Sequence, residues 1–367
     1  MSANKPETAS KRRQLALQKY AMSRAAYLTE EGSKSVSQKC DDVDVDVVVL
    51  WVEDSREHRD IRNAHAASIN KGIFDNQETR FRCNQELRYC LRSIFWCMKW
   101  VRRVHVVVAD YQYPTNFIDP ALLENAPGCP EIRVIPHSII MAPGDLPTFN
   151  SQAIEAKLHH IPGLAERFVY FNDDFMLGRP LPKSFFYTQD KAAVPCYNFD
   201  QSMVPDRKKH PSMSQHAQAW CNNSKVLTKL FGEPIGDGRL YPSHVAVPML
   251  KSSFSQVWKI PLVQKLLART SSSKFRKSFN LYIIGFLVYW NLYRRGAKTH
   301  TSSDCFFHDL EEGDDAVGLC KYLMRSTPGL FCINDGAYTS KERGPMKKTM
   351  NAMYPLRTPW EPKTSRS

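Results

Sequence analysis

The first half of the chain alternates between continuous apolar runs and stretches in which apolar residues recur at helical spacing. The run VDVDVVVLWV, residues 43–52, is rich in β-branched valine and is typical of a strand buried on both faces. Shorter runs predict strands over residues 103–109 and 131–137. A further strand, RFVYF, leads directly into Asn172.

Two helices are predicted between these strands. From Leu87 to Met98 the apolar residues fall three and four positions apart, which places them on one helix face. A second helix is predicted within residues 148–163, where Asn150 is one of three candidate caps and a Pro-Gly pair ends the pattern. The order of strands and helices predicts an α/β fold with a largely parallel sheet flanked by helices.

The apolar pattern also predicts how the chain is divided. Residues 1–40 have little apolar patterning, so we expect a flexible or weakly helical basic tail. Residues 41–362 are predicted to form a single domain, and residues 363–367 a short tail. Within the domain we expect an α/β half over 41–195 and a helix-rich half over 196–362, packed over the carboxyl edge of the sheet.

Composition narrows the class of protein. The 367 residues are 43% apolar and 24% charged, as in globular proteins. The longest apolar run, residues 281–290, has about half the length that a membrane-spanning helix needs. This run predicts a buried core helix. The net charge of +13 indicates an anionic partner (nucleic acid, a membrane surface or phosphorylated substrates), although a solvated basic surface explains it equally well. Ten cysteines without a CxxC pair predict free thiols and a reducing compartment.

Two adjacent carboxylates, Asp173 and Asp174, follow the strand RFVYF and Asn172. Ligands of open α/β sheets bind at the carboxyl ends of strands, and two carboxylates beside an amide suit a hard divalent cation. The alternative is a capping turn, because Asn and Asp favour turns and helix starts. A similar pair, Asn334 and Asp335, follows another apolar run, so we expect these groups to meet at one rim.

The first strand also ends in acids, with Asp54 in LWVED, and the second half supplies a base and a cation. His216 is a candidate base, although a single histidine is more often a surface or core residue. Arg276 lies in SSSKFRKSFN with Asn280 one turn on, which suits a phosphate clamp or, equally, a solvated basic loop. The chain has no P-loop, GxGxxG, GxSxG, zinc-type or RNP motif, which argues against those nucleotide, hydrolase and sequence-specific nucleic-acid sites.

In order along the chain, four blocks resemble the Stealth family: bacterial capsular-polysaccharide hexose-1-phosphate transferases and the catalytic subunit of N-acetylglucosamine-1-phosphotransferase. The blocks are DVDVVVLWVEDS at residues 44–55, RFRCNQELRYCLRSI with LPTFNSQAIEAKLHHIPGLAERFVYFNDDFMLG at 80–178, a looser block from His216 to LYIIGFLVYW, and CINDG with MYPLRTPWE at 332–361. The first block departs from the family pattern, because no glycine follows Trp51 and Val52. Cys83 stands where the second block usually has an acid, and Gln218 where the third often has a proline.

The resemblance implies transfer of a sugar-1-phosphate from a nucleotide-diphosphate sugar to an acceptor hydroxyl of a glycan, with release of a nucleoside monophosphate and with Mg2+ or Mn2+ as cofactor. It implies a phosphotransferase domain over residues 41–362. The alternatives are a metal-dependent glycosyltransferase and a non-enzymatic protein that binds anionic ligands.

No apolar leader is seen at the start of the sequence, so we expect the protein in the cytoplasm or peripheral to a membrane, held there by its basic tail. The Golgi lumen is the alternative if the sequence lacks its true start.

Carried onto this sequence, the resemblance and the acid pairs assign the following roles. The catalytic residues are Asp173, Asp174, His216 and Arg276, where His216 or one of the paired aspartates is the base; the metal ligands are Asp173, Asp174 and Asp335; and the substrate-binding residues are Trp51, Asp54, Arg82, Asn84, Asn150, Asn172, Asn280 and Asn334.

Overall fold

The computed structural model describes residues 9–37, 43–68, 78–125, 130–188, 193–195, 197–202, 213–233, 239–296 and 304–363. Its main sheet has five strands in the order β3-β2-β1-β4-β8. The first four are parallel to one another, and only β8 runs antiparallel. The predicted α/β fold with a largely parallel sheet is therefore confirmed. The bounds are β1 Val45–Leu50, β2 Arg103–Val108, β3 Glu131–Pro136, β4 Arg167–Asn172 and β8 Val247–Leu250.

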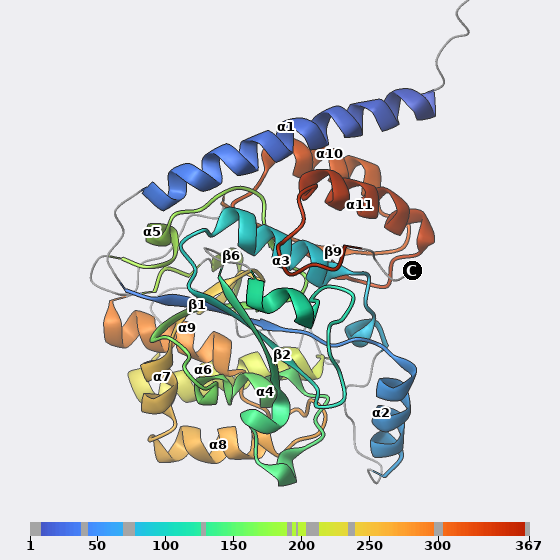
Figure 1. Cartoon of the computed structure of the whole chain (residues 1–367). Helices are drawn as coiled ribbons and strands as arrows, with labels where there is room; N and C mark the ends of the chain where they lie inside the picture. Colours follow the sequence, from blue (N-terminus) through green and yellow to red (C-terminus); the bar gives the residue numbers. More distant parts are fainter. Residues whose placement is uncertain are drawn as a thin grey trace, which may run out of the picture.

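Helices cover both faces of this sheet, with α3 on one side of β1 and α4, α6 and α9 on the other (Figure 1). Every residue of β1 is buried, as its β-branched sequence predicts. The run at 281–290 lies in α9, which is buried from Ile283 to Asn291. The helices are α1 Ala9–Ser37, α2 Arg56–Ser68, α3 Glu86–Cys97, α4 Ser151–Glu155, α5 Lys183–Phe186, α6 Gln215–Phe231, α7 Lys251–Val257, α8 Pro261–Ser271, α9 Ile283–Arg295, α10 Ala316–Ser326 and α11 Ser340–Met353.

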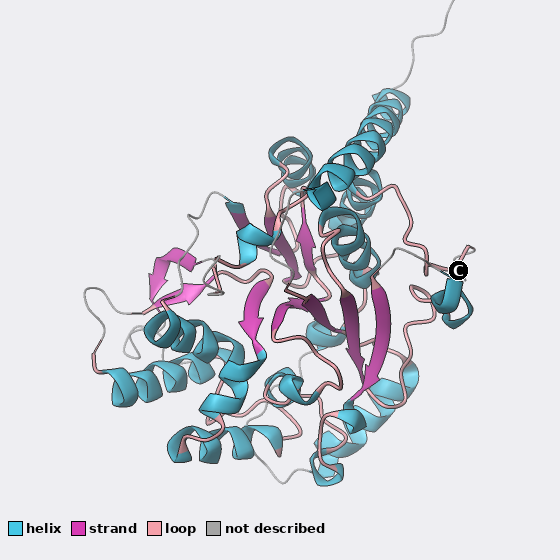
Figure 2. Ribbon diagram, turned by 60° about the vertical axis from the view of Figure 1, so that its left-hand side comes forward, coloured by secondary structure: helices cyan, strands magenta, loops and turns pink. Residues whose placement is uncertain are grey.

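The second half of the chain contains more strands than predicted. Besides β8, it contributes β9 (Cys305–Leu310) and β10 (Leu330–Asp335), which pair in parallel with each other. The strand β5 (Phe175–Leu177) joins β10 on its other side and completes a three-stranded sheet. A two-stranded sheet, β6 (Tyr197–Ser202) with β7 (Leu240–Pro242), is also present. Figure 2 shows the strands gathered at the centre of the molecule with helices around them.

The N-terminal segment, expected to be flexible or weakly helical, is a helix that packs on the domain. Along α1, the Tyr20 hydroxyl donates to the Met324 carbonyl at 3.2 Å, and Arg24 Nε donates to the Met353 carbonyl at 3.2 Å. Leu28 is fully buried, and α1 lies across α10 and α11 (Figure 1). Of the two alternatives, residues 9–37 therefore adopt the helical one, and the helix is packed rather than loose. Three contact positions four residues apart are too few to give a clear periodic signal.

Two further expectations meet the structure here. Cys305 is disulfide-bonded, so the prediction of free thiols is wrong for this residue. Within the described part of the chain, no helix combines the length and the apolar character that crossing a bilayer requires. Residues 364–367 lie outside the described residues. The described cysteines that are free are Cys83, Cys90, Cys97, Cys221, Cys320 and Cys332.

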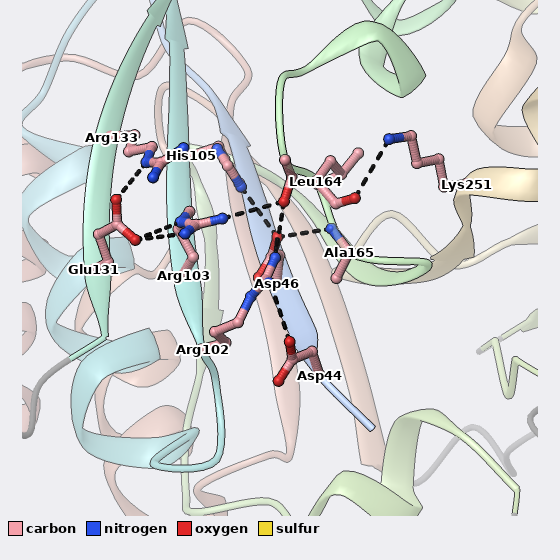
Figure 3. A network of polar contacts seen from close by, with 11 residues as sticks. Asp44, Asp46, Arg102, Arg103, His105, Glu131, Arg133, Leu164, Ala165 and Lys251 are labelled. Carbon is pink, nitrogen blue, oxygen red and sulfur yellow. Dashed lines mark hydrogen bonds and ion pairs between the residues drawn. The ribbon is translucent and has the colours of Figure 1, made fainter. Parts of the chain in front are cut away.

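A polar network closes the amino end of the main sheet (Figure 3). Asp46 of β1 is fully buried and accepts hydrogen bonds from Arg102 at 2.7 and 2.8 Å, from His105 at 3.1 Å and from the Ala165 amide at 2.9 Å. Burial raises the pKa of Asp46, but the bonds from His105, Arg102 and Ala165 outweigh burial and lower it to about 2. One carboxylate thus joins β1 and β2 to the segment that precedes β4.

Candidate active site

A cavity of about 1120 Å³ lies at the carboxyl ends of β1 and β4 and is also lined by the end of β10. The structure therefore brings the acids after β4 and the Asn-Asp pair of β10 to one space, as the sequence predicts, while the pair after β1 does not line it. The sequence-predicted site residues that line the cavity are Trp51, Arg82, Asn172, Asp173, Asp174, His216, Arg276, Asn334 and Asp335.

The acidic end of the cavity is formed by the turn between β4 and β5. Burial raises the pKa of Asp173 well above its usual range, and the charges of Asp174 and Glu86 raise it further. Burial also raises the pKa of Asp174, although His244 and a hydrogen bond from the Cys332 thiol act against it. The thiol sulfur lies 3.2 Å from Asp174 Oδ2, and Asp174 Oδ1 is buried without a hydrogen-bond partner among the described residues.

Glu86, the first residue of α3, belongs to this acidic end although it is not among the predicted site residues. Burial raises the pKa of Glu86 to about 7, and the charge of Asp174 acts in the same direction. Its carboxylate accepts the Asn84 amide N–H at 2.5 Å. Three carboxyl groups thus face one another in a poorly hydrated space, and their repulsion favours a bound cation.

Asp335 is held by other protein groups. Arg82 Nε donates to Asp335 Oδ2 at 2.5 Å, and a second guanidinium nitrogen contacts Oδ1. Asn84 Nδ2 lies 3.2 Å from Asp335 Oδ2, and the Ala337 amide donates to Oδ1 at 3.0 Å. The predicted Arg82 and Asn84 therefore position Asp335 in this structure, and the role of Asp335 as a metal ligand stays a prediction.

His216 makes two contacts through its ring nitrogens. The Trp220 indole N–H donates to His216 Nε2 at 3.0 Å, and Gln152 Nε2 lies 3.4 Å from Nδ1. An indole nitrogen can only donate, so Nε2 accepts and the ring proton lies on Nδ1, where the Gln152 amide meets it with its oxygen, an atom that otherwise has no partner among the described residues. Burial and then the charge of Arg276 lower the pKa of His216 well below its usual value, so the ring is neutral. Its one lone pair is already engaged, which weakens the case for His216 as the base.

Arg276 lies against a buried acid. Arg276 Nη2 donates to Ser151 Oγ at 2.8 Å. Burial raises the pKa of Glu155 to about 7, and the nearby charge of Arg276 opposes that rise. The Tyr170 hydroxyl lies 3.1 Å from Glu155 Oε1 and 2.6 Å from Asn172 Oδ1. Since Tyr170 has one proton, its hydroxyl can donate to only one of these two oxygens at a time.

Another part of the cavity wall is aromatic. Its walls include Trp51, Phe81, Phe149 and the imidazole of His58. Burial, and then the charge of Arg62, lower the pKa of His58 to about 4, so the ring is neutral. The Trp51 indole nitrogen and His58 Nε2 are both buried without hydrogen-bond partners among the described residues. A planar heteroaromatic ring with exposed acceptors suits such a slot.

The remaining predicted residues do not line the cavity and take part in hydrogen bonds instead. Asp54 Oδ2 accepts from Arg59 at 3.0 Å. Asn150 caps α4 and donates to the Ser273 carbonyl at 3.1 Å, which ties α4 to the segment that carries Arg276. Asn280 accepts the Lys277 amide at 2.5 Å. These bonds shape the loop around Arg276, and substrate binding by these residues stays a prediction.

The acidic end has the donors that a divalent cation needs. Asp173 and Asp174 present carboxylate oxygens on one turn, and the buried Asp174 Oδ1 has no partner among the described residues. Oxygen donors of this kind suit Mg2+ and Mn2+. The two aspartates therefore fit the predicted cofactor.

Comparisons with known proteins place the chain. The family model described as "Stealth protein CR2, conserved region 2" matches residues 80–194. The chain is 30% identical over 298 residues to a capsular polysaccharide phosphotransferase of Neisseria meningitidis, covering 79% of this chain and 77% of the relative. It is 29% identical over 302 residues to a capsular polysaccharide phosphotransferase of Haemophilus influenzae, covering 80% and 78%.

Two further comparisons extend the picture. An exopolysaccharide phosphotransferase of Streptomyces coelicolor is 31% identical over 331 residues, which cover 87% of this chain and 52% of that longer protein. Among solved structures, the galactosyltransferase LgtC in complex with donor and acceptor sugar analogues matches with a TM-score of 0.42 and 13% identity, over 85% of this chain and 96% of that one. That likeness is too low to carry an argument. The level of identity and coverage to the first relative shows that the chain belongs to the Stealth family and is a transferase of phosphorus-containing groups.

Proposed function

We propose that the protein transfers a sugar-1-phosphate from a nucleotide-diphosphate sugar to a hydroxyl of a glycan acceptor. The observation that carries this proposal is one cavity of about 1120 Å³ whose lining combines an aromatic part, the paired carboxylates and Arg276. The aromatic part suits the nucleobase of such a donor, the carboxylates suit a cation bound to its diphosphate, and Arg276 suits the charge on the transferring phosphoryl group. The relatives named as capsular and exopolysaccharide phosphotransferases support a polysaccharide acceptor.

The proposed reaction exchanges one phosphorus–oxygen bond for another. The acceptor hydroxyl oxygen bonds to the β-phosphorus, and the bond from that phosphorus to the bridging oxygen breaks. The bridging oxygen leaves on the nucleoside monophosphate, the acceptor proton passes to a base, and the sugar C1–O bond is untouched. The product is a phosphodiester between sugar and acceptor.

The residues divide this work. Trp51 and His58 line the aromatic part of the cavity and receive the nucleobase against their rings. Arg276 binds the transferring phosphoryl group through its guanidinium fork. Asp173 and Asp174 hold the divalent cation, which when bound neutralises charge on the diphosphate. Because the lone pair of His216 accepts from Trp220, the geometry favours a carboxylate of the acidic end as the proton acceptor.

The test is a panel of nucleotide-diphosphate sugars (UDP- and GDP-sugars), incubated with Mg2+ or Mn2+ and an oligosaccharide acceptor. We expect release of a nucleoside monophosphate that depends on the acceptor, measured by chromatography. Release of a nucleoside diphosphate instead indicates glycosyl transfer, and no release across the whole panel contradicts the proposal. Asp173→Asn is expected to be inactive, and Asp60→Asn, whose side chain is 71% exposed on α2, is the matched control that stays active.

A further inference from the structure

Asp174 also belongs to a second set of possible metal ligands, in which a nitrogen and a sulfur donor join its carboxylate. Asp174 comes from the turn after β4, His244 from the segment before β8, and Cys332 from β10. One ligand atom from each residue lies within 4.8 Å of those of the other two. Asp174 and His244 line the cavity, while Cys332 is fully buried behind them.

The geometry of this set is close to that of a bound transition metal. The sulfur of Cys332 and Oδ2 of Asp174 are 3.2 Å apart. Tetrahedral zinc with bonds of about 2.0 Å to oxygen and about 2.3 Å to sulfur places two such ligands about 3.5 Å apart. The thiol and the carboxylate therefore need only a small movement apart to bind one ion, and the imidazole nitrogen lies within 4.8 Å of both.

The third donor has a fixed orientation. The His244 ring meets Phe175 edge-on at a centroid distance of 4.9 Å and Phe307 at 5.4 Å, with interplanar angles of 88° and 90°. Among the described residues, no hydrogen bond to His244 is seen. Asp174 Oδ1 likewise lacks a partner there. The cluster thus combines an immobilised imidazole, a carboxylate with spare acceptor capacity and a thiol.

We infer that Asp174, His244 and Cys332 form a site for a thiophilic divalent cation, with zinc as the preferred ion. A sulfur and a nitrogen donor favour zinc and cobalt over Mg2+, which prefers oxygen ligands throughout. Three protein ligands with one open position are typical of zinc sites that bind a substrate, and here the open position faces the cavity. Binding converts the thiol to a thiolate and releases one proton to solvent. We expect a diphosphate oxygen of the donor to occupy the open position as the fourth ligand, and this part of the inference rests on the proposed function.

The test uses the full chain, stripped of metal by a chelator and kept free of thiol reagents. Co2+ is titrated while the near-ultraviolet absorption is recorded, because a cobalt–thiolate bond gives a charge-transfer band. We expect one equivalent of Co2+ to develop this band and one equivalent of Zn2+ to abolish it. Calorimetry with Zn2+ then gives the affinity, which we expect to fall at least about tenfold in Cys332→Ser and in His244→Gln.

The matched control is Cys221→Ser, which removes another buried free cysteine, on α6, and should keep both the band and the affinity. The inference is overturned if the wild-type protein binds Co2+ without the band, or if the band persists in Cys332→Ser. Because the wild-type spectrum decides the question alone, a variant that fails to fold does not leave it open. Monophosphate release with Mg2+ but without the cobalt band overturns this inference and leaves the proposed function standing.

Discussion

Replacing Asp46 by Asn tests how the amino end of the sheet supports the site. The change removes the negative charge that Arg102, His105 and the Ala165 amide surround. It also puts a side-chain NH2 group, which can only donate, among neighbours that are donors themselves. Because Asp46 is fully buried, a neighbouring water molecule cannot take over these bonds. We therefore expect a loss of stability with little change in the cavity, which lies at the opposite ends of the same strands.

The magnitude follows from the pKa. Lowering the pKa of Asp46 from 3.8 to about 2 corresponds to about 2.4 kcal/mol at about 1.4 kcal/mol per pH unit. The pKa of Asp46 is lower in the folded protein than in the unfolded chain, so its ionised form stabilises the fold at any pH above the unfolded-state pKa. This stabilisation is lost as the pH falls through the folded-state pKa. The free energy of unfolding of Asp46→Asn should therefore lie about 2 to 3 kcal/mol below wild type from pH 5 to 8, and the gap should narrow from about pH 4 towards pH 2.

Urea denaturation followed by circular dichroism measures this gap at each pH. Asp44→Asn is the control, because Asp44 also pairs with Arg102, at 3.0 Å, but is 60% exposed and should cost less than about 1 kcal/mol. A cost for Asp46→Asn equal to that of Asp44→Asn, or a gap that stays constant down to pH 2, would refute the reasoning. The folded fraction of Asp46→Asn should keep its turnover number.

Three further outcomes are expected. Asp174→Asn removes one of several crowded like charges, so the cation-free variant should melt at a higher temperature while turnover falls at least about a hundredfold; a lower melting temperature contradicts the repulsion. Gly285→Ala puts a methyl group 2.1 Å from the Trp220 ring, so the free energy of unfolding should fall by about 1–3 kcal/mol and kcat/KM should also fall. The control Gly344→Ala, with nothing within 4 Å of the added methyl group, should be neutral or stabilising in thermal unfolding. Glu155→Gln should stabilise the ligand-free protein at pH 8 but not at pH 4, and a pH-independent effect would count against this. Burial raises the pKa of Glu155 from 4.5 to about 7, so the cost of ionising it in the folded protein builds up between these pH values and is fully present at pH 8.

The sequence predicted the centre of the fold because that signal is local. The β-branched run around β1 and the acids that follow β4 needed no knowledge of distant residues, and both lie where expected. The edge strand β8 was not predicted, since VPML has four residues and contains Pro248. A proline is tolerated in an edge strand, but it weakens the sequence pattern of a strand.

The site was predicted less completely because its contacts join remote parts of the chain. Arg82 and Asp335 are 253 positions apart, and neither sequence neighbourhood indicates that an ion pair forms between them. Arg92 of α3 is buried against Glu361, at 2.7 and 2.9 Å, although the two residues are 269 positions apart. The set around His244 joins three elements, so no spacing rule for metal ligands applies to it.

The central claim is that the phosphorus attached to the sugar moves together with the sugar. A nucleotide-diphosphate sugar that carries a radioactive label in its β-phosphorus, incubated with the protein, the divalent cation and the glycan acceptor, tests this most directly. The account predicts that the label appears in the glycan as a phosphodiester, in equal amount to the unlabelled nucleoside monophosphate released. Label that stays in a released nucleoside diphosphate, while the sugar alone reaches the glycan, would contradict it.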